Sequence, residues 1–251
     1  MTDSVTRFSS RVENYAKYRP TYPSAVVDIL KSDGALTPNS IIADVGSGTG
    51  ILSERFLENG NRVFGIEPNA PMRLYAERSL LKFPNFVSVE GTAEATTLEP
   101  ASVDFVTAGQ AFHWFNQSKA KNEFARILRP GGWVVLIWNE RRVDSTPFLR
   151  DYERLLLQFG TDYAKVRHEI VQGEIAGFYA PAPFALRSVE NLQHFDFESL
   201  KGRTRSASYT PEPGDPTFEP FFSKLEEVFL SHEMNGKVTV EYDTRVYYGR
   251  L

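Results

Sequence analysis

Seven residues near the start of the chain combine a carboxylate with three closely spaced glycines: Asp44-Val45-Gly46-Ser47-Gly48-Thr49-Gly50. Glycine lets a backbone turn tightly and approach a ligand without a side-chain clash. If a helix begins at this point, its unpaired N–H groups face the same ligand. The segment therefore predicts a binding loop for a nucleotide or for the carboxylate of an amino acid.

The spacing of these glycines separates two classes of ligand. A dinucleotide fingerprint needs Gly-x-Gly-x-x-Gly, but here Ile51 takes the place of the third glycine and Gly50 stands one residue earlier. Asp44, two residues before the first glycine, would repel a phosphate and attract an amine or a cation. The loop therefore disfavours a pyrophosphate, and an NAD(P)-dependent oxidoreductase is the less favoured alternative.

A second acid, Glu67, follows 21 residues after Gly46. This is close to the ~20 residues at which a ribose-binding carboxylate is expected. A carboxylate can accept two hydrogen bonds from a ribose diol. Glu67 therefore indicates a ribose, although an ordinary acid at the end of a strand is the alternative.

Short apolar segments alternate with helical patterns through the first two thirds of the chain. Strands are expected at residues 41–45, 62–66, 86–89, 103–107 and 133–138, and helices at 49–59, 72–83 and 118–128. Nearly continuous apolar strands predict a parallel sheet that is covered on both faces. Open sheets of this doubly wound α/β class bind ligands at the carboxyl ends of their strands, which is where the loop and Glu67 fall.

The pattern changes after residue 142. Helices are expected at residues 147–160, 162–175 and 218–233, strands at 189–197 and 238–248, and a loop at 203–215. We expect a single domain over residues 1–251, whose core comprises about 36–142 and 186–251, with an N-terminal helical cap at 1–30 and a helical lid inserted at about 146–185.

Composition narrows the class of protein. The chain has 251 residues, 41% of them hydrophobic and 24% charged, a net charge of −4 and no cysteine. These values are typical of a globular protein and give no overall attraction to nucleic acid. The first residues contain no apolar segment of a secretory signal, so we expect a cytoplasmic protein that binds neither nucleic acid nor membrane, as a monomer or homodimer. The arginines at 141–142 and 203–205 could hold an anion but are expected to be solvated.

Four motifs together resemble the class I S-adenosylmethionine (SAM)-dependent methyltransferases. They are the loop at 44–50, Gly65-Ile66-Glu67, Val103-Asp104-Phe105-Val106 and Ile127-Leu128-Arg129-Pro130-Gly131-Gly132. Three further segments resemble a small-molecule branch, methyltransferase type 11, that includes trans-aconitate methyltransferase-like proteins. These are Phe8-Ser-Ser-Arg-Val-Glu-Asn-Tyr-Ala-Lys-Tyr-Arg-Pro20, Gln110-Ala-Phe-His-Trp-Phe115 and Gly202-Arg-Thr-Arg-Ser-Ala-Ser-Tyr209.

The resemblance implies a Rossmann-like sheet of seven strands with the last strand antiparallel, and SAM as the cofactor, with S-adenosylhomocysteine as its product. The implied cofactor-binding residues are Tyr15, Tyr18, Arg19, Asp44, Gly46, Ser47, Gly48, Gly50, Glu67, Pro68, Met72, Thr92, Ala93, Glu94, Gln110, Ala111 and Trp114. Relatives often have Gly-Asp-Ala after strand three, whereas Thr92 stands here in the middle position, so the contact with the adenine amine must differ.

The acceptor of the methyl group is expected to be a small molecule. Candidate substrate-binding residues are His113, Trp114, Trp138, Asn139, Arg203 and Arg205. Guanidinium groups match carboxylates bidentately, so Arg19, Arg203 and Arg205 could hold a carboxylate, with surface or structural roles as the alternative. His113 is the candidate general base if the acceptor is a hydroxyl, and a histidine of the pocket wall if it is not. No grouping of residues has metal-ligand spacing.

The predicted function is methylation of a carboxylate or hydroxyl oxygen on a small molecule by a SAM-dependent transferase (EC 2.1.1.-). A SAM-binding protein without catalysis is the other alternative, because methyl transfer needs few protein groups. A nucleic-acid or protein methyltransferase is disfavoured, since residues 110–114 contain no Asn/Asp-Pro-Pro-Tyr motif.

Overall fold

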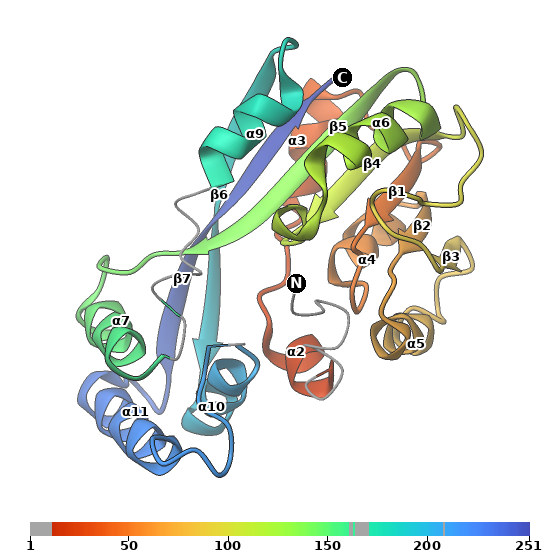
Figure 1. Cartoon of the computed structure of the whole chain (residues 1–251). Helices are drawn as coiled ribbons and strands as arrows, with labels where there is room; N and C mark the ends of the chain where they lie inside the picture. The colour runs from red at the N-terminus through yellow and green to blue at the C-terminus, as the bar shows by residue number, and fades with distance from the viewer. Residues whose placement is uncertain (1–11, 161–162, 164–170, 208) are drawn as a thin grey trace.

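A computed structural model of the chain describes residues 12–160, 163, 171–207 and 209–251. Seven strands form one sheet in the order β3-β2-β1-β4-β5-β7-β6 (Figure 1). The strands are β1 Ile41–Val45, β2 Arg62–Ile66, β3 Phe86–Val89, β4 Val103–Gly109, β5 Leu128–Arg141, β6 Phe184–Phe195 and β7 Val238–Gly249. Strand β7 is antiparallel to both neighbours, β5 and β6, and the pairs among β1 to β5 are parallel. The predicted Rossmann-like sheet with an antiparallel last strand is confirmed.

Helices precede, connect and follow these strands. They are α2 Val12–Tyr18, α3 Ala25–Asp33, α4 Ile51–Glu58, α5 Ala70–Ser79, the short 3₁₀ helix η1 Phe112–Trp114, α6 Gln117–Ile127, α7 Pro147–Phe159, α9 Val171–Tyr179, α10 Phe197–Arg205 and α11 Phe218–His232. Within the described ranges, none of them is both long enough and apolar enough to span a bilayer.

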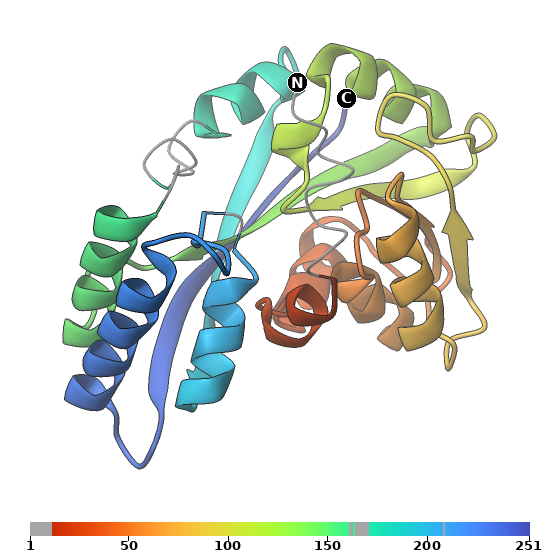
Figure 2. The same ribbon diagram turned by 60° about the horizontal axis from the view of Figure 1, so that its bottom comes forward.

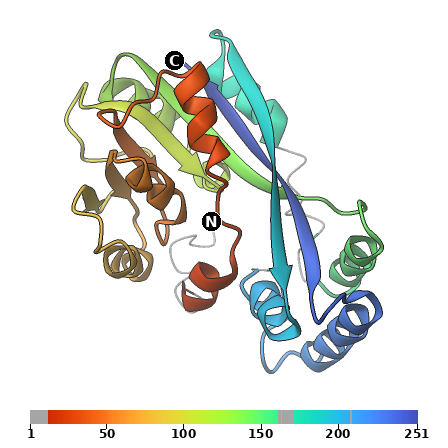
Figure 3. The same ribbon diagram turned by 180° about the vertical axis from the view of Figure 1, so that it is seen from behind.

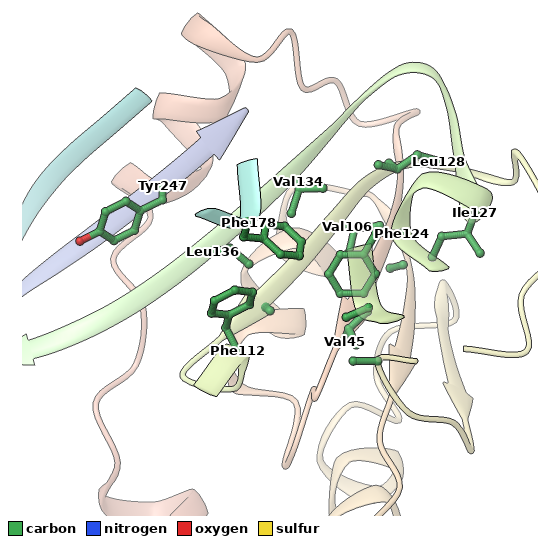
Figure 4. Close-up of a cluster of buried hydrophobic side chains, with 14 of the residues drawn as sticks. Val45, Val106, Phe112, Phe124, Ile127, Leu128, Val134, Leu136, Phe178 and Tyr247 are labelled. Atoms are coloured by element: carbon green, nitrogen blue, oxygen red, sulfur yellow. The ribbon is translucent and has the colours of Figure 1, made fainter. Parts of the chain in front are cut away.

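The alternation of side chains along β5 builds a core on each face of the sheet. Val134, Leu136 and Trp138 pack with apolar residues of α6 and α9 in one buried cluster (Figure 4). Val135 and Ile137 point the other way, into a cluster with residues of α3, α4 and α5. Figure 3 shows α3 across that second face. The central strands are therefore covered on both sides, as their continuous apolar sequences predict.

A third buried cluster joins α7, α10 and α11 to the last residue of β6 and the first half of β7. In Figure 2 these three helices lie together at the end of the sheet away from α4 and α5. Helix α2 lies between the two groups, in contact with both α5 and α10. The segment after α2 and helix α10 therefore lie near the carboxyl ends of β1, β4 and β5.

Three elements differ from the sequence-based expectation. Residues 203–205 form the last turn of α10 rather than a loop. Strand β6 begins five residues earlier than expected, at Phe184, because its whole length pairs with β7. Strand β5 begins at Leu128, which pairs with Val103 before a register shift leads to the regular pairing from Trp133 onward. Most of the helix expected at 162–175 lies outside the described residues.

Candidate active site

The glycine loop joins the end of β1 to the start of α4. Gly46, Gly48 and Gly50 all have positive φ, at 68°, 57° and 85°, a region that favours glycine. A Cβ added at Gly46 would also lie only 2.6 Å from the Cβ of Ala111. The backbone N–H groups of Gly46 and Ser47 donate to the carbonyl of Ile66, at 2.8 and 3.1 Å. The loop is thereby held against the end of β2.

Asp44 lies at the base of this loop and is 1% exposed. Its two carboxylate oxygens accept hydrogen bonds from Ser53 Oγ at 2.6 Å and from Thr107 Oγ1 at 3.0 Å. Burial raises the pKa of Asp44 to about 6, against the opposing effect of these hydrogen bonds. A buried acid with a pKa near neutrality is typical of a ligand-binding site.

Glu67 follows the last residue of β2 and faces the same loop. Its carboxylate accepts the backbone N–H of Gly48 at 2.9 Å and that of Asn69 at 2.8 Å. Burial raises the pKa of Glu67, although both of these bonds and nearby Arg73 act in the opposite direction. A carboxylate has about four lone-pair sites, so two remain for the hydroxyl groups of a ribose.

A cavity of about 40 Å³ lies beside the loop; we call it the loop cavity. Its described lining residues are Arg19, Pro20, Tyr22, Asp44, Gly46, Ser47, Gly48, Thr49, Ile51, Leu52, Gly109, Gln110 and Asn139. Thr49 Oγ1 and Gln110 Oε1 are buried and lack a hydrogen-bond partner within the described part of the chain. Gln110 also has a positive φ of 55°, and strained residues of this kind cluster at functional sites.

The hydrogen-bonding chemistry of these unpartnered atoms can be compared with that of the amino-acid end of SAM. A threonine hydroxyl can donate to a carboxylate, and a glutamine oxygen or the Asp44 carboxylate can accept from an ammonium group. The loop glycines leave room for a ligand next to the backbone. The donor set therefore fits an amino acid at the loop and a ribose at Glu67, as SAM would require.

A second cavity of about 340 Å³ adjoins the first; we call it the arginine cavity. Its described lining residues are Arg19, Pro20, Gln110, Asn139, Glu140, Arg141, Arg142, Val143, Asp144, Ser145, Tyr163, Arg203, Tyr209, Tyr242 and Asp243. The two cavities share Arg19, Pro20, Gln110 and Asn139. A ligand in one can therefore meet a ligand in the other at Gln110.

Asn139 holds the strands and the segment after α2 together at this junction. Its Oδ1 accepts from Thr244 Oγ1 at 2.5 Å and from Asn191 Nδ2 at 3.1 Å. Its Nδ2 lies 3.4 Å from the carbonyl oxygens of Pro20 and Thr21, and its own carbonyl accepts from Gln110 Nε2 at 3.1 Å. Asn139 thus lines both cavities and fixes their shape, and its role in binding a substrate stays a prediction.

Many of the predicted residues come together here. Arg19, Asp44, Gly46, Ser47, Gly48 and Gln110 line the loop cavity, and Glu67 is bonded to the loop. Gly50 caps the start of α4. Met72 is buried with its sulfur near Gly48, and Ala111 contacts Gly46. Half-buried Pro68 follows Glu67. Asn139 and Arg203 line the arginine cavity.

Other predicted residues lie outside both cavity linings. Exposed His113 and Trp114 contact each other in η1. Trp138 packs edge-on against Phe112 and Tyr247 in the core. Exposed Arg205 lies over the ring of Phe218, and Tyr18 packs against Gly202 of α10. Thr92, Ala93 and Glu94 form a turn in which Ala93 is buried and Glu94 accepts the backbone N–H of Asn116. The side chain of Tyr15 lies outside the described residues.

The burial of two lining arginines was not expected, and several other lining residues escaped prediction. Arg141 and Arg203 were expected to be solvated, but they are 9% and 5% exposed. This expectation is wrong because α7 packs against both of them and Tyr242 of β7 packs against Arg203. The adjacent arginines at 141–142, at the end of β5, were the available signal for an anion site. Tyr163 and Tyr242 had no such signal, since each lies far from the motifs in sequence, whereas Tyr22 lies two residues after one of the quoted segments and Tyr209 is the last residue of another.

Comparisons with known proteins agree with this geometry. Residues 43–136 match the model of a methyltransferase domain. An uncharacterized methyltransferase of Mycobacterium tuberculosis is 40% identical over 139 residues, which are 55% of this chain and 54% of that protein. A methyltransferase-like protein of Schizosaccharomyces pombe is 33% identical over 155 residues, 62% of this chain and 59% of its own length. The matches thus span little more than half of these relatives.

Solved structures share the fold over nearly the whole chain. A candidate type II methyltransferase from Anaeromyxobacter dehalogenans has a TM-score of 0.68 at 23% identity, covering 93% of this chain and 98% of that one. A candidate methyltransferase from Anabaena variabilis has a TM-score of 0.63 at 22% identity, covering 94% and 99%. None of these comparisons bears on the trans-aconitate branch, which stays a prediction. From the domain match, the relatives and the fold together, residues 43–136 form a methyltransferase domain, and the chain shares its overall fold with solved methyltransferase structures.

Proposed function

We propose that this protein transfers a methyl group from SAM to an oxygen of a small molecule, a carboxylate or a hydroxyl. The observation that carries the proposal is the pair of adjoining cavities. The loop cavity has the donors and acceptors for the amino-acid end of SAM, and the arginine cavity has the volume of a small-molecule site. Gln110 belongs to both linings, at the point where donor and acceptor would meet.

Methyl transfer requires little of the protein beyond positioning the methyl donor and the acceptor. When bound, SAM would supply a methyl group on a cationic sulfur: the acceptor oxygen would form a bond to that methyl carbon while the C–S bond breaks and its electron pair leaves with the sulfur, giving S-adenosylhomocysteine. Asp44, Thr49 and Gln110 orient the donor, and Asn139 fixes the backbone around the junction. Holding two reactants in the right geometry is by itself a large catalytic effect.

The kind of acceptor decides whether a base is needed. A hydroxyl must lose its proton during transfer, whereas an ionised carboxylate has none to lose. Among the described residues that line the arginine cavity there is no histidine, and His113 lies outside it. A carboxylate acceptor therefore suits this cavity better, and for a hydroxyl the role of His113 as base stays a prediction.

The test is formation of S-adenosylhomocysteine from SAM in the presence of a panel of small organic acids and their matched alcohols. Time-dependent formation with acids, and methyl esters as products, would support the proposal. Tight binding of SAM without transfer to any acid, alcohol or small-molecule extract would instead support the alternative, a SAM-binding protein without catalysis.

A further inference from the structure

Residues 19–22, which connect α2 to α3, form one wall of the cofactor region; we call them the strap (Figure 3). Arg19 and Pro20 line both the loop cavity and the arginine cavity, and Tyr22 lines the loop cavity. The strap is neither helix nor strand. Within the described part of the chain, none of its backbone groups is bonded to the backbone of a strand. Side chains must therefore hold the strap against the sheet.

Three side-chain amides of β5 and β6 bind the carbonyl groups of the strap. Asn191 Nδ2 donates to the carbonyl of Thr21 at 2.7 Å. Asn139 Nδ2 lies 3.4 Å from the carbonyl oxygens of Pro20 and Thr21, and Gln193 Nε2 lies 3.4 Å from the first carbonyl of the strap. Hydrogen bonds from N–H to oxygen commonly measure ~2.7–3.2 Å. The bond from Asn191 is therefore the strongest of these four attachments.

Asn191 reaches the cofactor region only through other residues. Its side chain is 9% exposed, and it belongs to the described lining of neither cavity. An amide nitrogen has two N–H donors, and here one serves Thr21 while the other donates to Asn139 Oδ1 at 3.1 Å. Both donors of Asn191 thus serve to fix the strap and the residue beside it.

The loop cavity is too small for the ligand that its chemistry fits. It measures about 40 Å³, whereas one water needs ~10–15 Å³ and pockets for small ligands commonly measure ~300–1,000 Å³. A wall must therefore move before the amino-acid end of SAM can enter. Backbone hydrogen bonds fix the other walls, including those from Gly46 and Ser47 to the carbonyl of Ile66. The strap, held by side chains, is the wall that can move.

We propose that Asn191 is a positioning residue for the cofactor site: it latches the strap against the sheet, and the cofactor enters and leaves when this latch opens. Because Arg19 and Pro20 also line the arginine cavity, closing the latch sets the wall of both cavities at once. This inference rests on the proposed function for the identity of the ligand, whereas the latch itself is a property of the free protein.

The first test measures how fast S-adenosylhomocysteine binds and leaves, by stopped-flow fluorescence. The chain has no cysteine, so a fluorophore on the single thiol of Thr21→Cys, at an exposed position of the strap, reports on one site. We expect Asn191→Ala in this labelled protein to raise both the association and the dissociation rate constants about fivefold or more, because the open strap is more populated. Unchanged rates would overturn the proposal.

The rise in the association rate separates a latch from a merely structural residue. Damage to the pocket would speed dissociation and slow association, and that pair of results would also overturn the proposal. Asn191→Asp keeps the size of the side chain and removes both donors, so it should raise both rates as Asn191→Ala does; unchanged rates in this variant would overturn the role of the hydrogen bond. Ser188→Ala, at an exposed position of β6, is the matched control and should change neither rate.

A second test needs no cofactor. Spin labels are placed on Thr21→Cys and on Leu81→Cys, since Leu81 is 83% exposed, and the distance between them is measured in the free protein. We expect Asn191→Ala to add a second population of distances, and identical distributions with and without this substitution would overturn the latch. Failure of S-adenosylhomocysteine to bind the unaltered protein would contradict the proposed function, while the spin-label result would still decide the role of Asn191.

Discussion

Asp44 shows how burial gives one side chain an unusual response to pH. Burial raises its pKa to about 6 from an ordinary 3.8, the hydrogen bonds from Ser53 and Thr107 lower it, and the neighbouring charge of Glu67 raises it further. The folded protein therefore binds a proton at Asp44 more readily than the unfolded chain does, although Asp44 is still ionised at pH 7. The stability that Asp44 contributes is complete below its ordinary pKa and is lost as pH rises through about 6.

The same titration should control cofactor binding. Below pH 6 Asp44 loses the charge that attracts an ammonium group, so we expect S-adenosylhomocysteine to bind roughly tenfold more weakly at pH 5 than at pH 7. Asp44→Asn should bind weakly at both values and lose this pH dependence. Calorimetric titration checks the prediction, with Asp28→Asn on exposed Asp28 as control. An unchanged pH profile in Asp44→Asn would rule out the role of Asp44.

Gly46 is required for two separate reasons, its φ of 68° and the 2.6 Å that would separate an added Cβ from the Cβ of Ala111. We expect Gly46→Ala to lower the free energy of unfolding by about 1–3 kcal/mol and to weaken S-adenosylhomocysteine binding. Gly236→Ala is the matched control, because Gly236 has a similar φ of 75° but open space around it. Denaturant unfolding of both variants measures the difference, and equal losses would show that the contact with Ala111 is unimportant.

At the level of strands and helices, local patterns predicted the regular elements well. The positions of the loop, of Glu67 and of the first five strands could be predicted from the spacing of apolar residues and from the positions of glycines. Both signals are local in the sequence. Helix α10 was missed because glycine and charged residues dominate its sequence, although Asp196 caps it by accepting the backbone N–H of Ser199 at 2.8 Å. An Asp-x-x-Ser capping pattern was the overlooked signal.

Strands β5, β6 and β7 are connected to one another at the site by the side chain of Asn139. We expect Asn139→Ala to lower the free energy of unfolding by about 1–3 kcal/mol, because buried partners on Thr244 and Asn191 would lose their hydrogen bonds. Asn85→Ala is the control, since exposed Asn85 makes a long bond to the carbonyl of Gly60 at 3.3 Å. A loss no larger than that of the control would show that Asn139 is not a structural link.

The arginine cavity exists only in the whole molecule. Its lining comes from the segment after α2, from Gln110 directly after β4, from β5 and the segment that follows it, from Tyr163 and from α10, Tyr209 and β7. Asn191 Nδ2, for example, donates to the carbonyl of Thr21, 170 residues away in sequence. Contacts of this range leave no local pattern, which is why the sequence predicted the cofactor loop but not the buried state of Arg141 and Arg203.

The identity of the cofactor is tested most directly by calorimetric titration of the purified protein with S-adenosylhomocysteine, SAM and NAD⁺. Glu67→Ala is titrated alongside Glu77→Ala, a control on an exposed glutamate of α5. We expect micromolar binding of both SAM species, no binding of NAD⁺, and about tenfold or more weaker binding in Glu67→Ala alone, because a charged acceptor for the ribose hydroxyls is lost. Binding of NAD⁺ without a response to either SAM species would contradict the assignment of SAM as the cofactor.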